Sequence, residues 1–406
     1  PLYIQRARKC VKLADYTHMK SNALSMPTKP ITICTNAMDS PTAQQTQTGL
    51  NGEELAQEIK AWGQELGFQQ VGITDVNMAE HGERLQEWLK KNYHGEMAYM
   101  ADHGDKRYRP EKLVPDTLRI ITVRMDYMPP EIETLKILNS PQQAYISRYA
   151  LGRDYHKLMR KRITQLGKKI NAALSELNLE CNYRAFVDSA PVLERGLAQK
   201  SGQGWIGKNA MLINPKAGSY FFLGELFTDL PLPLDKPFEE MHCGSCRACL
   251  DFCPTDAIVD NHIVDGRKCI SYLTIELKGS IPEALRSKMG NRVFGCDDCQ
   301  LCCPWNKFSK PSAEPDFTPR HQLDSATLIE LFSWDEQTFL SKTEGTPIRR
   351  AGHERWLRNI AVGLGNADYH KDIISALNHR LAFDSALVKE HVLWALEQQK
   401  NKEDIQ

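Results

Sequence analysis

The sequence contains no apolar run that could cross a membrane, no net charge and no recognisable secretory signal. A membrane-spanning helix needs about 20 mostly apolar residues, and a signal peptide needs an apolar centre followed by small residues at a cleavage site. Basic and acidic side chains number 51 each, so overall charge gives no hint of a nucleic-acid or membrane partner. We therefore expect a cytoplasmic protein, in a compartment where thiols stay reduced.

A length of 406 residues is enough for two or three domains with separate cores. Residues 1–50 are rich in Ser, Thr, Pro and Gln, which predicts a disordered extension, and we hypothesise that Met38 is the biological start. From residue 51 to 236, helical patterns alternate with apolar strands, which predicts an α/β domain. Helices are predicted at 52–67, 153–177 and 190–202, strands at 68–74, 118–127 and 182–189, and a hairpin at 211–229 with Gly218 near its turn.

The remaining sequence divides into a cysteine-rich region, 237–310, and a helical region, 311–406, which begins in the predicted linker "SKPSAEPDFTP". Two similar stretches of the helical region, "RNIAVGLGN" and "EHVLWALEQ", begin at Arg358 and Glu390. Their matching small and apolar residues favour stacked helical-hairpin repeats.

Cysteine is abundant, and nine of the twelve residues fall between Cys243 and Cys303. Such clustering in a reducing compartment indicates metal ligands. "CGSCRACLDFCP" has the C-x₂-C-x₂-C-x₃-C-P spacing of bacterial ferredoxins with two iron–sulfur clusters, and "CDDCQLCCPW" nearly repeats it. Structural zinc is the alternative, but zinc sites use paired C-x₂-C knuckles and not this triple run. The scattered Cys10, Cys34 and Cys181 are expected to be bystanders.

The ferredoxin pattern assigns ligands to two clusters, because the fourth thiolate of each run serves the other cluster. For the second cluster, either Cys269 or Cys302 must complete the set. Since neighbouring side chains usually diverge and Cys303 is already assigned, we predict Cys269 as the ligand and Cys302 as a packed thiol. The first cluster is predicted to use Cys243, Cys246, Cys249 and Cys303, and the second Cys253, Cys269, Cys296 and Cys299.

The sequence resembles the epoxyqueuosine reductase family from about Leu50 to the C-terminus. The resemblance rests on the cysteine region and on three further motifs: "RYALGRDYHKLMRKR", "FVDSAPVLERGLAQKSGQGWIGKNAMLINPKAGSYFFLGEL" and "IRRAGHERWLRNIAVGLGN". The resemblance implies a cobalamin-binding catalytic domain similar to reductive dehalogenases and nitroreductases (51–236). It also implies a ferredoxin-like domain with two 4Fe–4S clusters (237–310) and a C-terminal HEAT-like domain (311–406). The implied reaction is reduction of epoxyqueuosine to queuosine at the wobble position of a transfer RNA.

Asp188 follows the predicted strand and precedes a helix with Pro191 in its first turn. From position alone, helix capping is the simpler interpretation, and Ser189 could serve as the cap equally well. The resemblance implies instead that Asp188 is the proton donor, and we expect burial near the corrin to raise its pKa.

The resemblance also implies contacts with the cofactor and the substrate. The D-x-H-x-x-G motif that supplies a histidine to cobalt in many corrinoid proteins is absent, as expected for this family. Tyr155 and His156 are expected to line the substrate side. The expected corrin contacts, beside Asp188 itself, are Arg107, Lys208, Asn209, Ser271 and Asp297.

Two groups of basic residues favour a folded RNA as substrate. Residues 148–169 carry eight Lys or Arg and one acid, and a second group consists of Arg349, Arg350, Arg355 and Arg358. Solvated helix faces are the usual location of such charges. Phosphate contacts are the functional alternative, and they dominate RNA affinity.

Two other functions remain open from the sequence: a corrinoid reductase of small molecules, and an electron-transfer or scaffold protein without a corrin. The absorption spectrum of anaerobically purified protein, with and without added cobalamin, would distinguish an electron-transfer or scaffold protein from a corrinoid enzyme, because only the enzyme would bind the corrin. We expect a monomer that receives electrons from a flavodoxin or ferredoxin.

Overall fold

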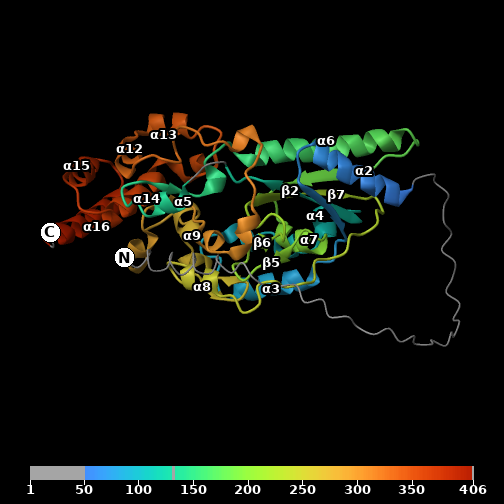
Figure 1. Cartoon of the computed structure of the whole chain (residues 1–406), viewed down its shortest axis with the longest axis horizontal. Helices are drawn as coiled ribbons and strands as arrows, with labels where there is room; N and C mark the ends of the chain where they lie inside the picture. The colour runs from blue at the N-terminus through green and yellow to red at the C-terminus, as the bar shows by residue number, and fades with distance from the viewer. Residues whose placement is uncertain (1–50, 130–132, 405–406) are drawn as a thin grey trace.

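The computed structural model describes residues 51–129 and 133–404, so the predicted extension, Met38, Cys10 and Cys34 lie outside it. Figure 1 shows a mixed sheet-and-helix part joined to a helical C-terminal part, with the cysteine-rich segment where the two meet. No helix in the described ranges is both long and apolar enough to span a bilayer.

The main sheet has the strand order β1-β2-β7-β4, and every neighbouring pair is antiparallel. The central strands β2 and β7 are buried along nearly their whole length, which explains why most of their residues are apolar. The alternation of helices and strands had predicted an α/β domain, but antiparallel pairing makes this part an α+β structure. The strands are β1 (Gln70–Thr74), β2 (Arg119–Asp126), β4 (Tyr183–Phe186) and β7 (Phe221–Thr228).

Helices cover both faces of the sheet (Figure 1). α2 (Gly52–Glu65) and α6 (Tyr155–Ser175) pack on one face, and α7 (Glu194–Lys200) packs on the other. Gly167 lets α6 approach β4 closely, because a Cβ at this position would lie 2.4 Å from the ring of Tyr183. This close packing sets the start of α6 beside the end of β4, where the candidate site lies.

The predicted hairpin at 211–229 is wrong in its pairing. Gly218, with φ +67, does lie in a tight turn, and an isolated bridge joins it to Asn214. However, the strand before this turn, β6 (Leu212–Ile213), pairs with β5 (Trp205–Ile206), whereas β7 joins the main sheet. The predicted helix at 190–202 is also shorter, because residues 187–193 form the loop that precedes α7.

The cysteine-rich region contains only short elements. β10 pairs in parallel with β3 (Tyr145–Ile146), so this region is tied to the sheet-bearing part of the chain. Its elements are α8 (Ala248–Phe252), β8 (Ile258–Asp260), β9 (Ile263–Val264), α9 (Ile270–Ile275), α10 (Glu283–Arg286), β10 (Arg292–Phe294) and α11 (Asp298–Leu301). Three short helices complete the part before it: α3 (Ala79–Lys90), α4 (Pro110–Leu113) and α5 (Thr134–Leu138).

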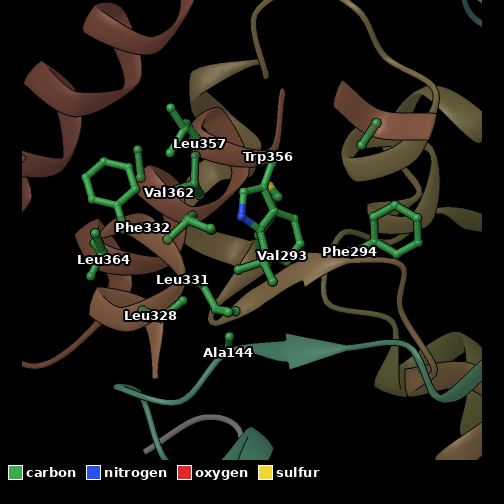
Figure 2. Packing of buried hydrophobic residues seen from close by; sticks show 14 of the residues in the cluster. Ala144, Val293, Phe294, Leu328, Leu331, Phe332, Trp356, Leu357, Val362 and Leu364 are labelled. Carbon is green, nitrogen blue, oxygen red and sulfur yellow. The ribbon is translucent and has the colours of Figure 1, made fainter. Parts of the chain in front are cut away.

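The C-terminal region is helical, as predicted, and α14 packs against α12, α13 and α16. Figure 2 shows part of its core, in which Trp356 lies beside Val293, and Ala144, just before β3, lies next to Leu331. One hydrophobic cluster thus joins the helices to residues of both earlier regions, and the stacked-repeat interpretation stays a prediction. The helices are α12 (Leu328–Ser333), α13 (Glu336–Lys342), α14 (Gly352–Asn366), α15 (Lys371–Arg380) and α16 (Ala386–Glu403).

The predicted linker packs on the protein surface beside α6. Phe317 is buried in the sheet core, and Glu314 forms an ion pair with Arg162 of α6. The connection between the two parts is therefore held in place by side chains.

Candidate active site and cysteine loops

Asp188 lies in the loop between β4 and α7, with its side chain turned toward α6. Its Oδ2 accepts a hydrogen bond from the Tyr155 hydroxyl at 2.9 Å and lies 3.0 Å from His156 Nε2. The carboxylate remains about half exposed, at 52%. It is therefore held by two side chains while one side stays accessible to a reactant.

The first turn of α6 fixes both partners of Asp188. Asp154 is the N-cap of this helix and accepts from the His156 backbone N–H. The same carboxylate lies 2.6 Å from His156 Nδ1, so the imidazole bridges Asp154 and Asp188. Tyr155 stacks on Phe222 of β7, with ring centroids 3.7 Å apart, which fixes its hydroxyl.

Arg350 connects this site to the C-terminal region. It lies in the 3₁₀ helix η8 (Pro347–Ala351), and its Nη2 donates to Asp154 Oδ2 at 2.9 Å. The same guanidinium lies 3.0 Å from His156 Nδ1. The site is therefore completed from both parts of the molecule.

The protonation of the site differs from the expectation. Burial alone would raise the pKa of Asp188, but the hydrogen bond and charge of His156, the Tyr155 hydroxyl and Arg350 together lower it. For His156, burial would lower the pKa, whereas the hydrogen bonds and charges of Asp154 and Asp188 raise it. In the chain by itself, the pKa of Asp188 is therefore lowered, contrary to the expected rise, while that of His156 is raised.

Two further acids lie behind Asp188. Glu194 Oε1 accepts from the Asp188 backbone N–H at 2.6 Å, and Glu225 of β7 is fully buried. Burial, followed by the charge of Asp188, raises the pKa of Glu194 to about 8. Burial and the charge of Glu194 raise the pKa of Glu225 well above its ordinary value.

The first predicted set of thiols lines one cavity. Cys243, Cys246, Cys249 and Cys303 surround a space of about 330 Å³, which Trp305 and Phe308 also line. The Trp205 indole N–H donates to Cys243 Sγ at 3.5 Å, a contact of the kind that tunes a cluster potential. No three Cys, His, Asp or Glu side chains of the described ranges lie close enough together to hold a single metal ion.

The second predicted set also comes together. Burial and the neighbouring thiols Cys269 and Cys253 raise the pKa of Cys299, and Cys269 likewise lies close to Cys296. Cys302 is buried against Ala248 and Phe252 in a separate small cluster. Cys181 lies far along the chain from both sets, and burial raises the pKa of its thiol to about 11.

The predicted corrin contacts lie in different places. Lys208 donates to the carbonyls of Gly244 and Cys246, and Asn209 donates to that of Cys299, so both bind the cysteine loops. Arg107 is nearly buried and donates to the Tyr99 carbonyl, whereas its Nε has no hydrogen-bond partner among the described residues.

The other two predicted corrin contacts have local roles. Asp297 accepts from Tyr145, Ser147 and the Arg148 N–H and is 1% exposed, which leaves its predicted corrin contact without geometric support. Ser271 lies in the first turn of α9, two residues after the N-cap residue Cys269, which is a predicted cluster ligand.

Of the four arginines predicted to bind RNA, two are exposed. Arg349 and Arg350 are open to solvent at the start of the C-terminal helices. Arg355 is half-buried and donates to the carbonyls of Ala351, Ile275 and Arg350. The prediction for Arg358 is wrong, because this residue is fully buried and donates to the carbonyls of Leu273, Leu277 and Gly279.

Sequence reasoning missed Asp154, Glu194 and Glu225 as members of the site. Two of them had a visible signal: Asp154 directly precedes a long helical pattern, and Glu225 interrupts the apolar strand "FFLGELFT". Glu194 had no such sequence signal, because an acidic residue in the first turn of a helix is common.

Comparisons with known proteins agree on one family. The model described as "Epoxyqueuosine reductase QueG, DUF1730" matches residues 107–189, and that of a "4Fe-4S double cluster binding domain" matches residues 242–306. Epoxyqueuosine reductase of Pseudomonas aeruginosa is 60% identical over 342 residues, covering 84% of this chain and 94% of that protein. This chain belongs to the epoxyqueuosine reductase family. As a member it is an oxidoreductase, and its cysteine region is a double 4Fe–4S domain.

Other epoxyqueuosine reductases support this assignment. The protein of Escherichia coli K12 is 56% identical over 350 residues, covering 86% of this chain and 91% of that protein. A crystal structure of epoxyqueuosine reductase with an epoxyqueuosine-modified tRNA-Tyr stem loop has a TM-score of 0.78, at 26% identity over 86% of this chain and 91% of that chain. The Bacillus subtilis enzyme, solved with a catalytic aspartate loop swung out of the active site, has a TM-score of 0.76 at 26% identity, over the same shares of the two chains.

Proposed function

We propose that this protein reduces epoxyqueuosine to queuosine at the wobble position of a transfer RNA. One observation carries the proposal: a half-exposed carboxylate, Asp188, is hydrogen-bonded to Tyr155 and His156 where the two parts of the molecule meet. Family membership supports it, as does the related structure with a modified tRNA stem loop.

The residues present fit the implied cofactors. Two sets of four thiols suit two 4Fe–4S clusters, and the proposed ligands are those predicted from the sequence. For cobalamin, the buried Nε of Arg107 is a donor without a partner in the described chain, which suits an amide or phosphate group of a corrin. Cobalamin, when bound, supplies the reduced cobalt chemistry that opens the epoxide.

The protein's own residues supply the proton. His156 Nε2 faces Asp188 Oδ2, and the hydrogen bonds and charges of Asp154 and Asp188 raise the pKa of His156, which favours the imidazolium as the proton carrier. Transfer along this 3.0 Å contact makes Asp188 the acid, and Asp188 then protonates the epoxide oxygen as its C–O bond breaks. Tyr155 donates to the same oxygen of Asp188 and keeps it oriented.

Exposed basic residues flank this site on both sides. On α6, Lys157, Arg160 and Lys161 are exposed, and Arg160 reaches Ser189 beside Asp188. Arg349 and Arg350 are exposed on the facing C-terminal region. These groups would hold the phosphates of an anticodon loop, while an unstacked base enters the site between them.

The domain organisation belongs to the same proposal. A cobalamin-binding domain spans 51–236, a ferredoxin-like domain 237–310 and a HEAT-like domain 311–406. The protein acts as a cytoplasmic monomer, with a flavodoxin or ferredoxin as its electron donor.

The test uses anaerobic protein with reconstituted clusters, a chemical reductant and tRNA that carries epoxyqueuosine. Mass spectrometry of the digested tRNA should show queuosine only when cobalamin is present. If no queuosine forms while a halogenated small molecule is reduced, the protein is a small-molecule corrinoid reductase.

A further inference from the structure

Asp188 occupies a strained position in the backbone. It is the central residue of a three-residue turn, in which the Ser189 N–H donates to the Val187 carbonyl at 2.6 Å, and its φ is +51. Turns of this kind with positive φ are rare and strained in residues other than glycine. Such a conformation persists only where the surroundings hold it.

The contact that holds this turn comes from the next helix. The Asp188 N–H donates to Glu194 Oε1 at 2.6 Å, and Glu194 is the first residue of α7. This hydrogen bond closes the loop of residues 187–193 onto α7. It leaves the Asp188 side chain free to meet Tyr155 and His156 on the opposite side.

Glu225 of β7 is the buried acid next to Glu194. It lies opposite Phe186 in the sheet and is fully buried, and neither of its two oxygens has a hydrogen-bond partner among the described residues. Two adjacent carboxyl groups form a hydrogen bond only if one of them keeps its proton. Burial, followed by the charge of Glu194, raises the pKa of Glu225, which favours a protonated Glu225 that can turn its O–H toward Glu194.

We infer that Glu194, backed by Glu225, is a positioning residue that holds the Asp188 turn with its carboxylate toward Tyr155 and His156. The inference rests on the proposed role of Asp188 as proton donor. Glu194 acts through the backbone of Asp188, and its oxygen is occupied by that N–H group.

Substitutions at Glu194 separate positioning from charge. Glu194→Ala removes the acceptor, whereas Glu194→Gln keeps a carbonyl oxygen at the same reach. We expect Glu194→Ala to lower the single-turnover rate about a hundredfold, as misplacement of a catalytic group by about 1 Å does. Glu194→Gln should restore most of the rate, and Glu87→Ala, an exposed glutamate of α3, should match the parent. Iron content and tRNA affinity should be unchanged in all three.

Glu225 is best replaced by leucine, because an apolar residue in a buried strand leaves no unpaired charge and the Glu225→Leu variant should still fold. It should fold and lower the rate by less than Glu194→Ala does. An unchanged rate would overturn the backing role of Glu225.

Two measurements keep this inference apart from the proposed function. In the Asp188→Asn background, Glu194→Ala should cause no further loss of rate, because the two residues act as a unit. In protein without cobalamin, the amides of residues 187–193 should exchange hydrogen faster in Glu194→Ala than in Glu194→Gln.

Equal rates for Glu194→Ala and Glu194→Gln, or unchanged exchange in Glu194→Ala, would overturn the positioning role. A fully active Asp188→Asn variant would instead overturn the proposed role of Asp188, and the exchange rates would still decide whether Glu194 holds the turn.

Discussion

At the scale of single residues, the acid of the site is a hydrogen-bonded pair. His156 lies between Asp154 and Asp188, so its pKa is raised and that of Asp188 is lowered. An isolated carboxylic acid would need an apolar pocket to keep its proton at neutral pH. In the proposed mechanism, His156 keeps the proton and Asp188 delivers it to the substrate.

Replacement of Asp188 by asparagine should remove most of the activity. The amide keeps the shape of the side chain but is a very poor acid, and general acid catalysis is typically worth about a hundredfold to ten-thousandfold. Both cluster spectra and cobalamin binding should remain normal. A variant that turns over at a near-normal rate would return Asp188 to the role of a loop or capping residue.

The pH dependence should report His156. Because its pKa is raised, the imidazolium persists above the ordinary range, and the rate should fall as the pH rises through that raised pKa. His156→Gln should abolish this alkaline decline and lower the rate at neutral pH. Single-turnover rates across the pH range test this, and an identical profile in the variant would rule out His156 as the proton source.

Cys269 and Cys302 should behave differently when replaced by alanine. Cys269 lies among the second set of thiols, whereas Cys302 packs against Ala248 and Phe252. Cys269→Ala should lower the iron content and alter the spectrum of one cluster, and Cys302→Ala should leave both clusters intact. Equal iron content in the two variants would refute the ligand assignment.

At the scale of elements, the sequence predicted those whose signal is local. The amphipathic pattern of α6 and the cysteine spacings required no knowledge of the fold. The pairing of β6 with β5 could not be predicted, because pairing depends on contacts distant in sequence. The same holds for Arg358: a charge on a helix is usually solvated, and only the packing of α14 on α9 makes it a donor to buried carbonyls.

Arg358 should therefore matter for stability and not for RNA binding. Arg358→Met keeps much of the volume but leaves the carbonyls of Leu273, Leu277 and Gly279 without their donor. We expect a loss of about 3 kcal/mol or more in the free energy of unfolding, since unsatisfied buried polar groups cost about 1–3 kcal/mol each. Thermal unfolding measures this, with the exposed Arg349→Met as control. Equal melting temperatures in the two variants would contradict it.

At the scale of the whole molecule, the active site requires both parts of the chain. Arg350 of the C-terminal region donates a hydrogen bond to Asp154 in the sheet-bearing part. The hydrophobic cluster in Figure 2 packs the C-terminal region against β3 and β10. Basic residues of both parts thereby lie near Asp188: Arg160 of α6 donates to Ser189, and Arg350 of η8 donates to Asp154.

Reversal of Arg349 and Arg350 to glutamate should weaken tRNA binding without changing the cluster spectra. Both side chains are exposed, and each lost phosphate contact should make the dependence of affinity on salt shallower. Arg350 also bonds Asp154, so Arg349→Glu alone serves as the variant that leaves the catalytic site intact. Unchanged affinity over the whole salt range would exclude the C-terminal region as the RNA platform.

We propose that the substrate is an RNA loop held across both parts of the molecule, with its modified base at Asp188. The most direct measurement compares kcat/KM for an epoxyqueuosine-containing stem loop with that for the free epoxyqueuosine nucleoside. We expect turnover of the stem loop and none measurable for the nucleoside, because binding energy from remote phosphates is needed to orient the base. Equal values for the two substrates would contradict it.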